Sequence, residues 1–356
     1  MALMGILAAT ASAQVTPPAA VTPPDDAPSI RVGVTLFTNY TYQTDPKITD
    51  ADGNSVHKSS FDVSRSYINV TGTISHIVAF RVTPDVTRES NTASSLSGSL
   101  VFRIKYAYLQ TNLDDWVGRG SYARLGVQQT PYLDYMEAIY RYRFQGTMFV
   151  ERQGYFASAD AGASFHYNFP SNYGDVHGGV FNGENYQKAE ANDQKDYMIR
   201  AAVRPFATRT PVLRVLRGAV FYDQGHYVRD AERKRVIGVV TFEHQYLTAG
   251  FEYLDAHDQV SIKVANVHSR GYSIWATPKQ SATSVGWEGL LRYDHLTPNS
   301  ALDSQKQNRI IAGVAYWFPH QGNVASALLV DYDGQIFKNI TTAPTRSVVV
   351  HGLVNF

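Results

Sequence analysis

Residues 29–43, SIRVGVTLFTNYTYQ, alternate between apolar and polar or small side chains. The apolar positions are Ile30, Val32, Val34, Leu36, Tyr40 and Tyr42. Successive side chains of a β-strand point to opposite faces, so a period of two indicates a strand with one apolar and one polar face. The stretch therefore predicts a strand whose two faces meet different environments.

The same alternation recurs along the chain, for example in GSLVFRIKYAYLQ (98–110) and in the final SVVVHGLVNF (347–356), whereas helical periodicity is nowhere as strong. By this criterion we expect about sixteen strands, near residues 29–43, 61–75, 76–88, 98–112, 120–130, 154–169, 173–183, 195–206, 213–226, 234–246, 247–256, 269–277, 283–296, 307–318, 323–333 and 346–356.

The connections between these strands alternate between short and long, and the longest spans 131–153. Short periplasmic turns and longer extracellular loops are typical of transmembrane β-barrels. A soluble sandwich also alternates, but aromatic residues at the strand ends favour a membrane barrel with aromatic girdles: Tyr40, Tyr42, Tyr106, Tyr108, Tyr167, Phe169, Tyr293, Tyr316 and Phe318. We predict an all-β protein, a transmembrane antiparallel β-barrel of about sixteen strands over residues 29–356, with both termini on the periplasmic side.

Composition agrees with a membrane barrel and excludes other classes. Charged residues make up 18% of the 356 residues, against about 25% in ordinary soluble domains. The net charge of +1 argues against a nucleic-acid partner. The absence of cysteine from the sequence excludes disulfides and thiolate metal sites.

The N-terminus predicts export. Residues 1–13 have an apolar core, Ala2 to Ala9, and the small-x-small pattern Ala11-Ser12-Ala13, as in a signal peptide. The run is too short to span a membrane, and its lack of a basic region suggests a start truncated by a few residues. A merely unstructured apolar N-terminus is the alternative. Residues 14–28 are rich in proline and predict a periplasmic leader.

Several segments resemble the phosphate-selective porin O and P family of Gram-negative outer membranes. They are FDVSRSYINVTG (61–72), RVTPDV (81–86), RIKYAYLQ (103–110), 125–170 and GGVFNGENY (178–186), followed in the second half by strand rhythm alone. The resemblance implies an outer-membrane homotrimer and a third extracellular loop that folds inward. It also implies that the terminal Phe356 is the signal read by the outer-membrane barrel assembly machinery.

Charges on the expected lumen face separate into two groups. The first five strands carry a basic wall, against the single acid Asp85: Arg31, Arg65, Arg81, Arg103, Lys105 and Arg124. Strands ten to fifteen carry an acidic wall, against Arg292 and Arg309: Glu243, Glu252, Glu288, Asp294 and Asp331. Opposed walls of opposite sign would set up a transverse field in the water column. The alternative is that these charges pair across strands.

The connection 131–153, PYLDYMEAIYRYRFQGTMFVERQ, is too long and too aromatic for a solvated loop, so we expect it inside the lumen. The pore constriction would then be formed by its charged residues: Asp134, Glu137, Arg141, Arg143, Glu151 and Arg152. The alternative for Arg141 and Arg143 is that they only fix the loop to wall acids such as Asp160.

These features predict a porin rather than an enzyme, a passive diffusion channel for small hydrophilic solutes or anions, without cofactor or metal. Lysines such as Lys47 and Lys188 fall in acid-containing connections, so we expect at most a mild anion preference rather than phosphate selectivity. A plugged barrel acting as adhesin, receptor or scaffold is the main alternative, and a barrel hydrolase is a weaker one. HGGV (177–180) lacks an accompanying G-x-S-x-G, and DADGN (50–54) lacks the glutamate that a calcium loop needs at position twelve.

Overall fold

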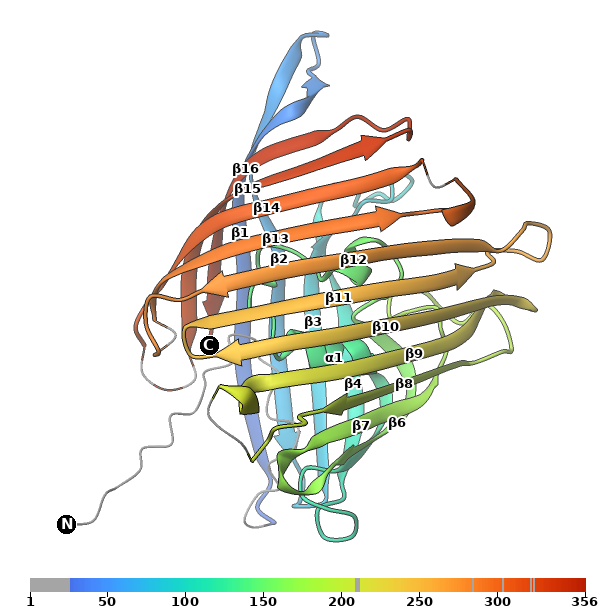
Figure 1. The fold of residues 1–356 in the computed structure, drawn as a ribbon, viewed down its shortest axis with the longest axis vertical. Helices are drawn as coiled ribbons and strands as arrows, with labels where there is room; N and C mark the ends of the chain where they lie inside the picture. Colours follow the sequence, from blue (N-terminus) through green and yellow to red (C-terminus); the bar gives the residue numbers. More distant parts are fainter. Residues whose placement is uncertain (1–25, 209–211, 284, 303, 321, 323) are drawn as a thin grey trace.

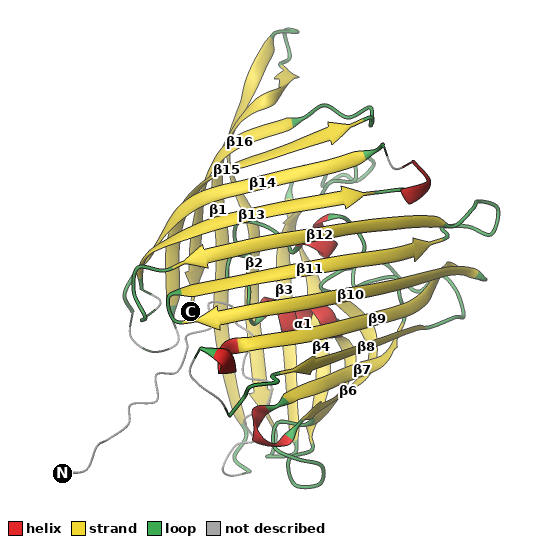
Figure 2. Cartoon of the chain, viewed as in Figure 1, coloured by secondary structure: helices red, strands yellow, loops and turns green. Residues whose placement is uncertain are grey.

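The computed structural model describes residues 26–208, 212–283, 285–302, 304–320, 322 and 324–356. Sixteen antiparallel strands form one closed barrel in which each strand pairs with its neighbours in the sequence and β1 pairs with β16 (Figures 1 and 2). The predicted sixteen-stranded β-barrel is confirmed. The expected signal peptide (1–13) and most of the expected leader (14–28) lie outside the described residues.

The strands occupy nearly the predicted ranges. They are β1 (Ser29–Thr49), β2 (Ser55–Thr73), β3 (Val78–Arg88), β4 (Leu100–Asn112), β5 (Tyr122–Gln129), β6 (Ala159–Asn168), β7 (Gly174–Phe181), β8 (Asp196–Val203), β9 (Leu216–Val228), β10 (Ala231–His244), β11 (Leu247–Asp258), β12 (Val267–Pro278), β13 (Gly286–Thr297), β14 (Lys306–Trp317), β15 (Ala325–Lys338) and β16 (Thr345–Asn355). Short 3-10 helices occur at Pro170–Asn172, Leu213–Val215 and Ser300–Leu302. None of the helices in the described part of the chain is long and apolar enough to cross a membrane.

The last strand closes the barrel against the first. Thr35 of β1 pairs with Asn355 of β16, and Val34 and Phe356 exchange two backbone hydrogen bonds of 2.9 Å. On β16, Val348, Val350 and Val354 are 37–47% exposed on the outer face, whereas His351 and Asn355 are buried in the lumen. The start of β1 and the end of β16 therefore share one rim, called here the terminal rim; the other is the loop rim. Short turns at one rim and longer loops at the other match the periplasmic and extracellular ends of such barrels.

The first hairpin is longer than expected. The expected strands at 29–43 and 61–75 imply a polar connection at 44–60, but β1 continues to Thr49 and β2 begins at Ser55, so the two strands project beyond the loop rim (Figure 1). The Asp50 carboxylate closes the turn by accepting hydrogen bonds from the backbone N–H groups of Asp52 and Asn54, at 3.0 and 2.8 Å. The carboxylate of this calcium-like stretch therefore has a structural role in the turn.

A β-bulge in β4 reverses which face its side chains occupy. Pro84 pairs with Ile104 but Thr83 pairs with Tyr106, so Lys105 is an extra residue. Before the bulge, Ile104 points outward and Arg103 inward; after it, Tyr106 points inward. The expectation that Tyr106 and Tyr108 belong to the outer aromatic girdle is wrong, because the bulge turns both into the lumen. There their rings lie 4.5 Å from the Arg81 guanidinium and 4.7 Å from that of Arg124, respectively.

Candidate functional site: the lumen and its inserted loop

The segment 130–158 leaves the loop rim after β5 and folds into the lumen. It contains two short helices, α1 (Pro131–Glu137) and α2 (Phe149–Arg152), drawn inside the barrel in Figure 2. Pro131 begins α1, where its missing N–H costs nothing. Nine hydrophobic side chains of this segment are at most 2% exposed: Tyr132, Leu133, Met136, Tyr140, Tyr142, Phe144, Met148, Phe149 and Val150. The predicted inward-folded third loop is confirmed.

Aromatic contacts attach the loop to the second half of the barrel wall. Tyr132 packs on Phe221 of β9 with ring centroids 5.7 Å apart, and Tyr140 meets Trp275 of β12 at 5.0 Å. Further along, Phe144 contacts aromatic rings of β1, β14 and β16: Phe37, Trp317 and His351. These strands contribute inward apolar side chains to one buried cluster with the loop, which explains why an aromatic loop is stable there.

Polar anchors fix the same face of the loop. The Arg141 guanidinium lies 3.7 Å from the Trp317 ring and forms an ion pair with the buried Glu288 of β13. The hydroxyl of Tyr132 donates to the buried Glu252 of β11. On β13, Arg292 donates to the Thr147 carbonyl oxygen over 3.1 Å. Arg141 therefore points to the wall, as the alternative to an aperture role anticipated, although its partner is Glu288 and not Asp160.

The remaining predicted constriction residues gather on the loop itself or near β5. Arg143 bridges Glu137, at 2.7 Å, and Glu151, which fixes the loop in a compact fold. Asp134 lies 3.7 Å from Arg124 and accepts a 3.3 Å hydrogen bond from the Tyr122 hydroxyl. Arg152 donates to the Gln145 side chain at 3.1 Å.

The basic wall lies on strands that the aromatic loop contacts little. Arg65, Arg81, Arg103, Lys105 and Arg124 all point into the lumen from β2 to β5, and Arg31 is exposed near the terminal rim on the same face of β1. Asp85, fully buried among them, pairs with Arg103 at 3.0 Å and with Arg65 at 4.0 Å. Lys105 donates to the Tyr67 hydroxyl at 3.1 Å. Of these five cations, Arg65 and Arg103 therefore pair with the wall acid Asp85.

The acidic wall is more fully paired than we expected. All five acids point inward, yet each has a partner: Glu243 pairs with Arg217, Glu252 with Tyr132, Glu288 with Arg141, Asp294 with Arg292 and Asp331 with His351. Two further lumen arginines, Arg233 and Arg235, lie on β10. Pairing of these charges, the alternative to an open acidic wall, describes this side better.

Sequence reasoning missed an ion-pair group on β8 to β11. Arg233 pairs with Asp196, and Arg235 pairs with Asp258 at 2.9 Å and with Asp223 at 3.9 Å. The strand expected at 234–246 leaves Arg233 in a loop. The alternation RKR at 233–235 could have indicated a strand that begins earlier, at Ala231.

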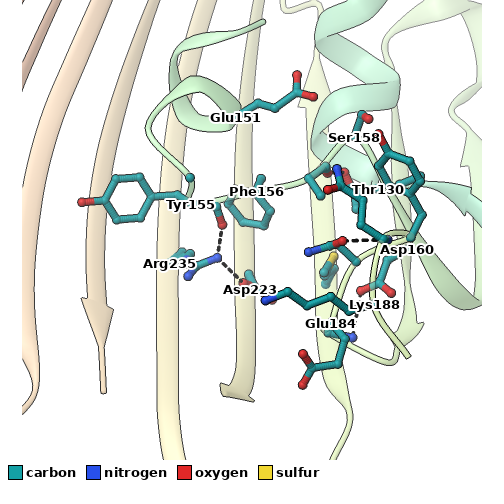
Figure 3. A pocket seen from close by; sticks show the side chains of 18 of the residues that line it. Thr130, Glu151, Tyr155, Phe156, Ser158, Asp160, Glu184, Lys188, Asp223 and Arg235 are labelled. Carbon is teal, nitrogen blue, oxygen red and sulfur yellow. Dashed lines mark hydrogen bonds and ion pairs between the residues drawn. The ribbon is translucent and has the colours of Figure 1, made fainter. Parts of the chain in front are cut away.

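Two cavities lie between the loop and the loop-rim half of the wall. The first, about 510 Å³, is lined by Glu151, Tyr155, Asp160, Asp223 and Arg235 among others, and Figure 3 shows these side chains around one space. The second, about 460 Å³, is lined by residues of the loop tip and of β1, β2 and β14 to β16. Arg65 and Thr147 line both cavities, so the two cavities adjoin beside Arg65 of the basic wall.

One lumen group has the residue types of a hydrolase triad. His177 Nε2 lies 3.1 Å from Ser164 Oγ, and its Nδ1 lies 3.7 Å from Asp134. The Ser164 hydroxyl, however, donates over 2.6 Å to the side-chain oxygen of Gln128, and Ser164 and His177 are buried. A nucleophilic serine must direct its proton to the histidine base, so this geometry is that of a structural polar network.

Comparison with solved structures agrees with the barrel. OmpTdeltaL8, a loop L8 deletion mutant of the outer membrane protein OmpT of Vibrio cholerae, is 13% identical, with 93% of this chain and 100% of that chain covered and a TM-score of 0.65. The outer membrane channel DcaP of Acinetobacter baumannii is 10% identical, with 93% and 98% covered and a TM-score of 0.58. OmpF of Salmonella typhi, in complex with daunomycin, is 10% identical, with 93% and 98% covered and a TM-score of 0.59.

The chain has the fold of an outer-membrane porin barrel. OmpT of Vibrio cholerae and DcaP of Acinetobacter baumannii are outer-membrane proteins. At these identities the likeness concerns the fold alone. No family model and no curated protein matches the chain.

Proposed function

We propose that this protein is a porin, a passive diffusion channel for small hydrophilic solutes and ions, and not an enzyme. The observation that carries the proposal is the loop at 130–158, which is fixed to the wall by aromatic packing, the ion pair between Arg141 and Glu288 and the hydrogen bonds of Tyr132 and Arg292. This arrangement leaves two cavities beside the loop, which are lined by Glu151 of the loop and Arg65 of the basic wall among others. A rigid insert that narrows a polar lumen filters solutes by size.

The charges around that space favour a mild preference for anions. Together the two cavities are lined by seven cations (Arg65, Arg143, Arg152, Lys188, Arg233, Arg235 and Arg309) and five carboxylates (Glu151, Asp160, Glu184, Asp223 and Asp333). Cations in a narrow water column raise the local concentration of anions. Lysine is not concentrated here, so we propose no selectivity for phosphate, although the resemblance of residues 61–206 supports a distant relationship to the phosphate-selective porins.

We further propose that the protein forms a homotrimer. We also propose that Phe356 is the signal by which the barrel assembly machinery recognises the chain. A trimer form has been solved for the OmpT of Vibrio cholerae, which has a similar fold (TM-score 0.60). Phe356 is 71% exposed next to the seam between β1 and β16, where an outside factor could reach it.

Planar-bilayer recording of the purified full chain tests the proposed channel. We expect stable ohmic conductance steps and, in a KCl gradient, a reversal potential on the anion-selective side. A folded protein that inserts but never conducts would support a plugged adhesin, receptor or scaffold and overturn the proposal. Detergent-solubilised protein should show no esterase activity above that of Ser164→Ala.

A further inference from the structure

A group of two histidines and one aspartate lies outside the lumen, near the loop rim. Asp255 and His257 are close to the end of β11, and His268 is close to the start of β12. Their neighbours Leu254 and Ala256 are fully buried inside the barrel, whereas Tyr253 is exposed, so alternation places Asp255 and His257 on the outer face. No part of the lumen mechanism uses this group.

The strand register brings the three side chains together. His257 and His268 are directly opposite each other, with their rings stacked at a centroid distance of 3.9 Å. The Asp255 carboxylate oxygens lie 3.3 Å from His257 Nε2 and 3.0 Å from His268 Nε2. One donor atom from each residue falls within 4.8 Å of the others. Metal bonds of about 2.0–2.1 Å in a tetrahedral site place ligand atoms roughly 3.4 Å apart, so small side-chain rotations suffice.

We propose that Asp255, His257 and His268 bind a divalent transition-metal ion of the zinc type. Two imidazoles and one carboxylate are a ligand set that suits zinc, and three protein ligands leave a fourth coordination position open. Adjacent hydrogen-bonded strands hold the ligands in place before the metal binds, so little ordering entropy is lost. The ion would join β11 to β12 just below the connection at 259–266.

Arg270 is the main competitor for this site. Its Nε lies 3.2 Å from the Asp255 carboxylate and 3.2 Å from His268 Nε2. Metal binding must displace this guanidinium, which its 56% exposed side chain can accommodate. Across β10, Lys234 stands opposite His257 but is paired with Glu232 at 2.8 Å. Removing Arg270 should therefore strengthen binding, which is the reverse of what loss of a ligand does.

The sequence conceals this site. His257 and His268 are separated by the whole connection at 259–266, and no short motif links them. Only the antiparallel register, which pairs Asp258 with Val267, sets the two histidines face to face.

Calorimetric titration of ZnCl₂ into the untagged full chain in detergent tests the proposal. We expect one zinc ion per protomer, at least tenfold weaker binding in His257→Ala and in His268→Ala, and severalfold tighter binding in Arg270→Ala. His244 lies at the terminal-rim end of β10, far from the proposed site. His244→Ala is therefore the matched control and should bind zinc as the wild type does. Heat-dependent migration on gels confirms that each variant is folded.

Two results would overturn the site. One is zinc binding by the wild type that is no tighter than that of the folded double variant His257→Ala/His268→Ala. The other is a loss of affinity in His244→Ala as large as in the ligand variants, because that would show binding to scattered histidines.

Discussion

At the scale of single residues, Arg65 is the charge best placed to set ion preference. Its side chain is 24% exposed and lines both cavities beside the loop. Arg65→Gln should shift the reversal potential in a KCl gradient toward cations, because one cation leaves the narrow space. The shift should be larger at 0.01 M than at 1 M salt, since screening lengths are about 30 and 3 Å.

Two variants serve as controls for Arg65. Arg31→Gln removes the same charge from an exposed position at the terminal rim and should leave the reversal potential unchanged. Glu151→Gln removes an acid from the first cavity and should shift the potential toward anions. Equal shifts for Arg31→Gln and Arg65→Gln would show that net charge, not the aperture, determines preference.

His76, in the turn between β2 and β3, forms a pH-dependent contact with Asp26 of the N-terminal segment. Hydrogen bonding to Asp26, together with the nearby charges of Asp26 and Asp115, raises the pKa of His76 above its usual value near 6.5. The contact is therefore complete at pH values below about 6.5 and is lost as the pH rises through the raised pKa.

An NMR titration of the His76 ring checks this linkage. The midpoint should exceed 6.5 in the wild type and fall in Asp26→Asn. An identical midpoint in both proteins would contradict the contact between Asp26 and His76.

At the scale of elements, the extra residue in β4 determines which face each of its side chains occupies. Deleting Lys105 would remove the bulge and leave a regular strand in which Arg103, Tyr106 and Gln110 still face the lumen. We therefore expect the deletion variant to assemble, as measured by the heat-modifiable band, with Lys105→Ala as the control that keeps the bulge. A deletion variant that fails to assemble while Lys105→Ala assembles would contradict the assignment of Lys105 as the extra residue.

The ion pair between Arg141 and Glu288 anchors the inserted loop. Arg141→Ala leaves a carboxylate with a 1% exposed side chain without this partner, a change that costs about 3–5 kcal/mol when a buried pair is broken. We expect a lower thermal midpoint and noisier single-channel currents. Adding Glu288→Gln should recover part of the loss; an additive loss in the double variant would mean that the two residues act independently.

The strands were largely predictable from sequence, whereas the β4 bulge and the side-chain contacts between distant elements were not. A period of two located all sixteen strands, because each exposes one apolar face. The period did not reveal the bulge in β4, because Ile104 and Tyr106 are two positions apart and both apolar. Pro84 on the neighbouring strand could have indicated it, because proline inside a sheet often occurs at a bulge. The period could not assign Arg141 to Glu288, because 147 residues separate them and local pattern carries no information on such pairs.

At the scale of the whole molecule, the barrel has two unequal halves. Strands β8 to β16 present apolar side chains that pack against the loop, while β2 to β5 carry five inward cations, of which Arg65 lines both cavities. The loop therefore packs against the wall and also narrows the lumen. The apolar lumen residues determine its position.

Single-channel conductance with and without the inserted loop is the most direct test of this account. Replacing residues 133–148 by a short Gly-Ser linker should give a folded barrel whose conductance steps are severalfold larger than those of the wild type, because the narrowest part of the lumen is removed. Equal conductance in the two folded proteins would contradict the assignment of this loop as the constriction.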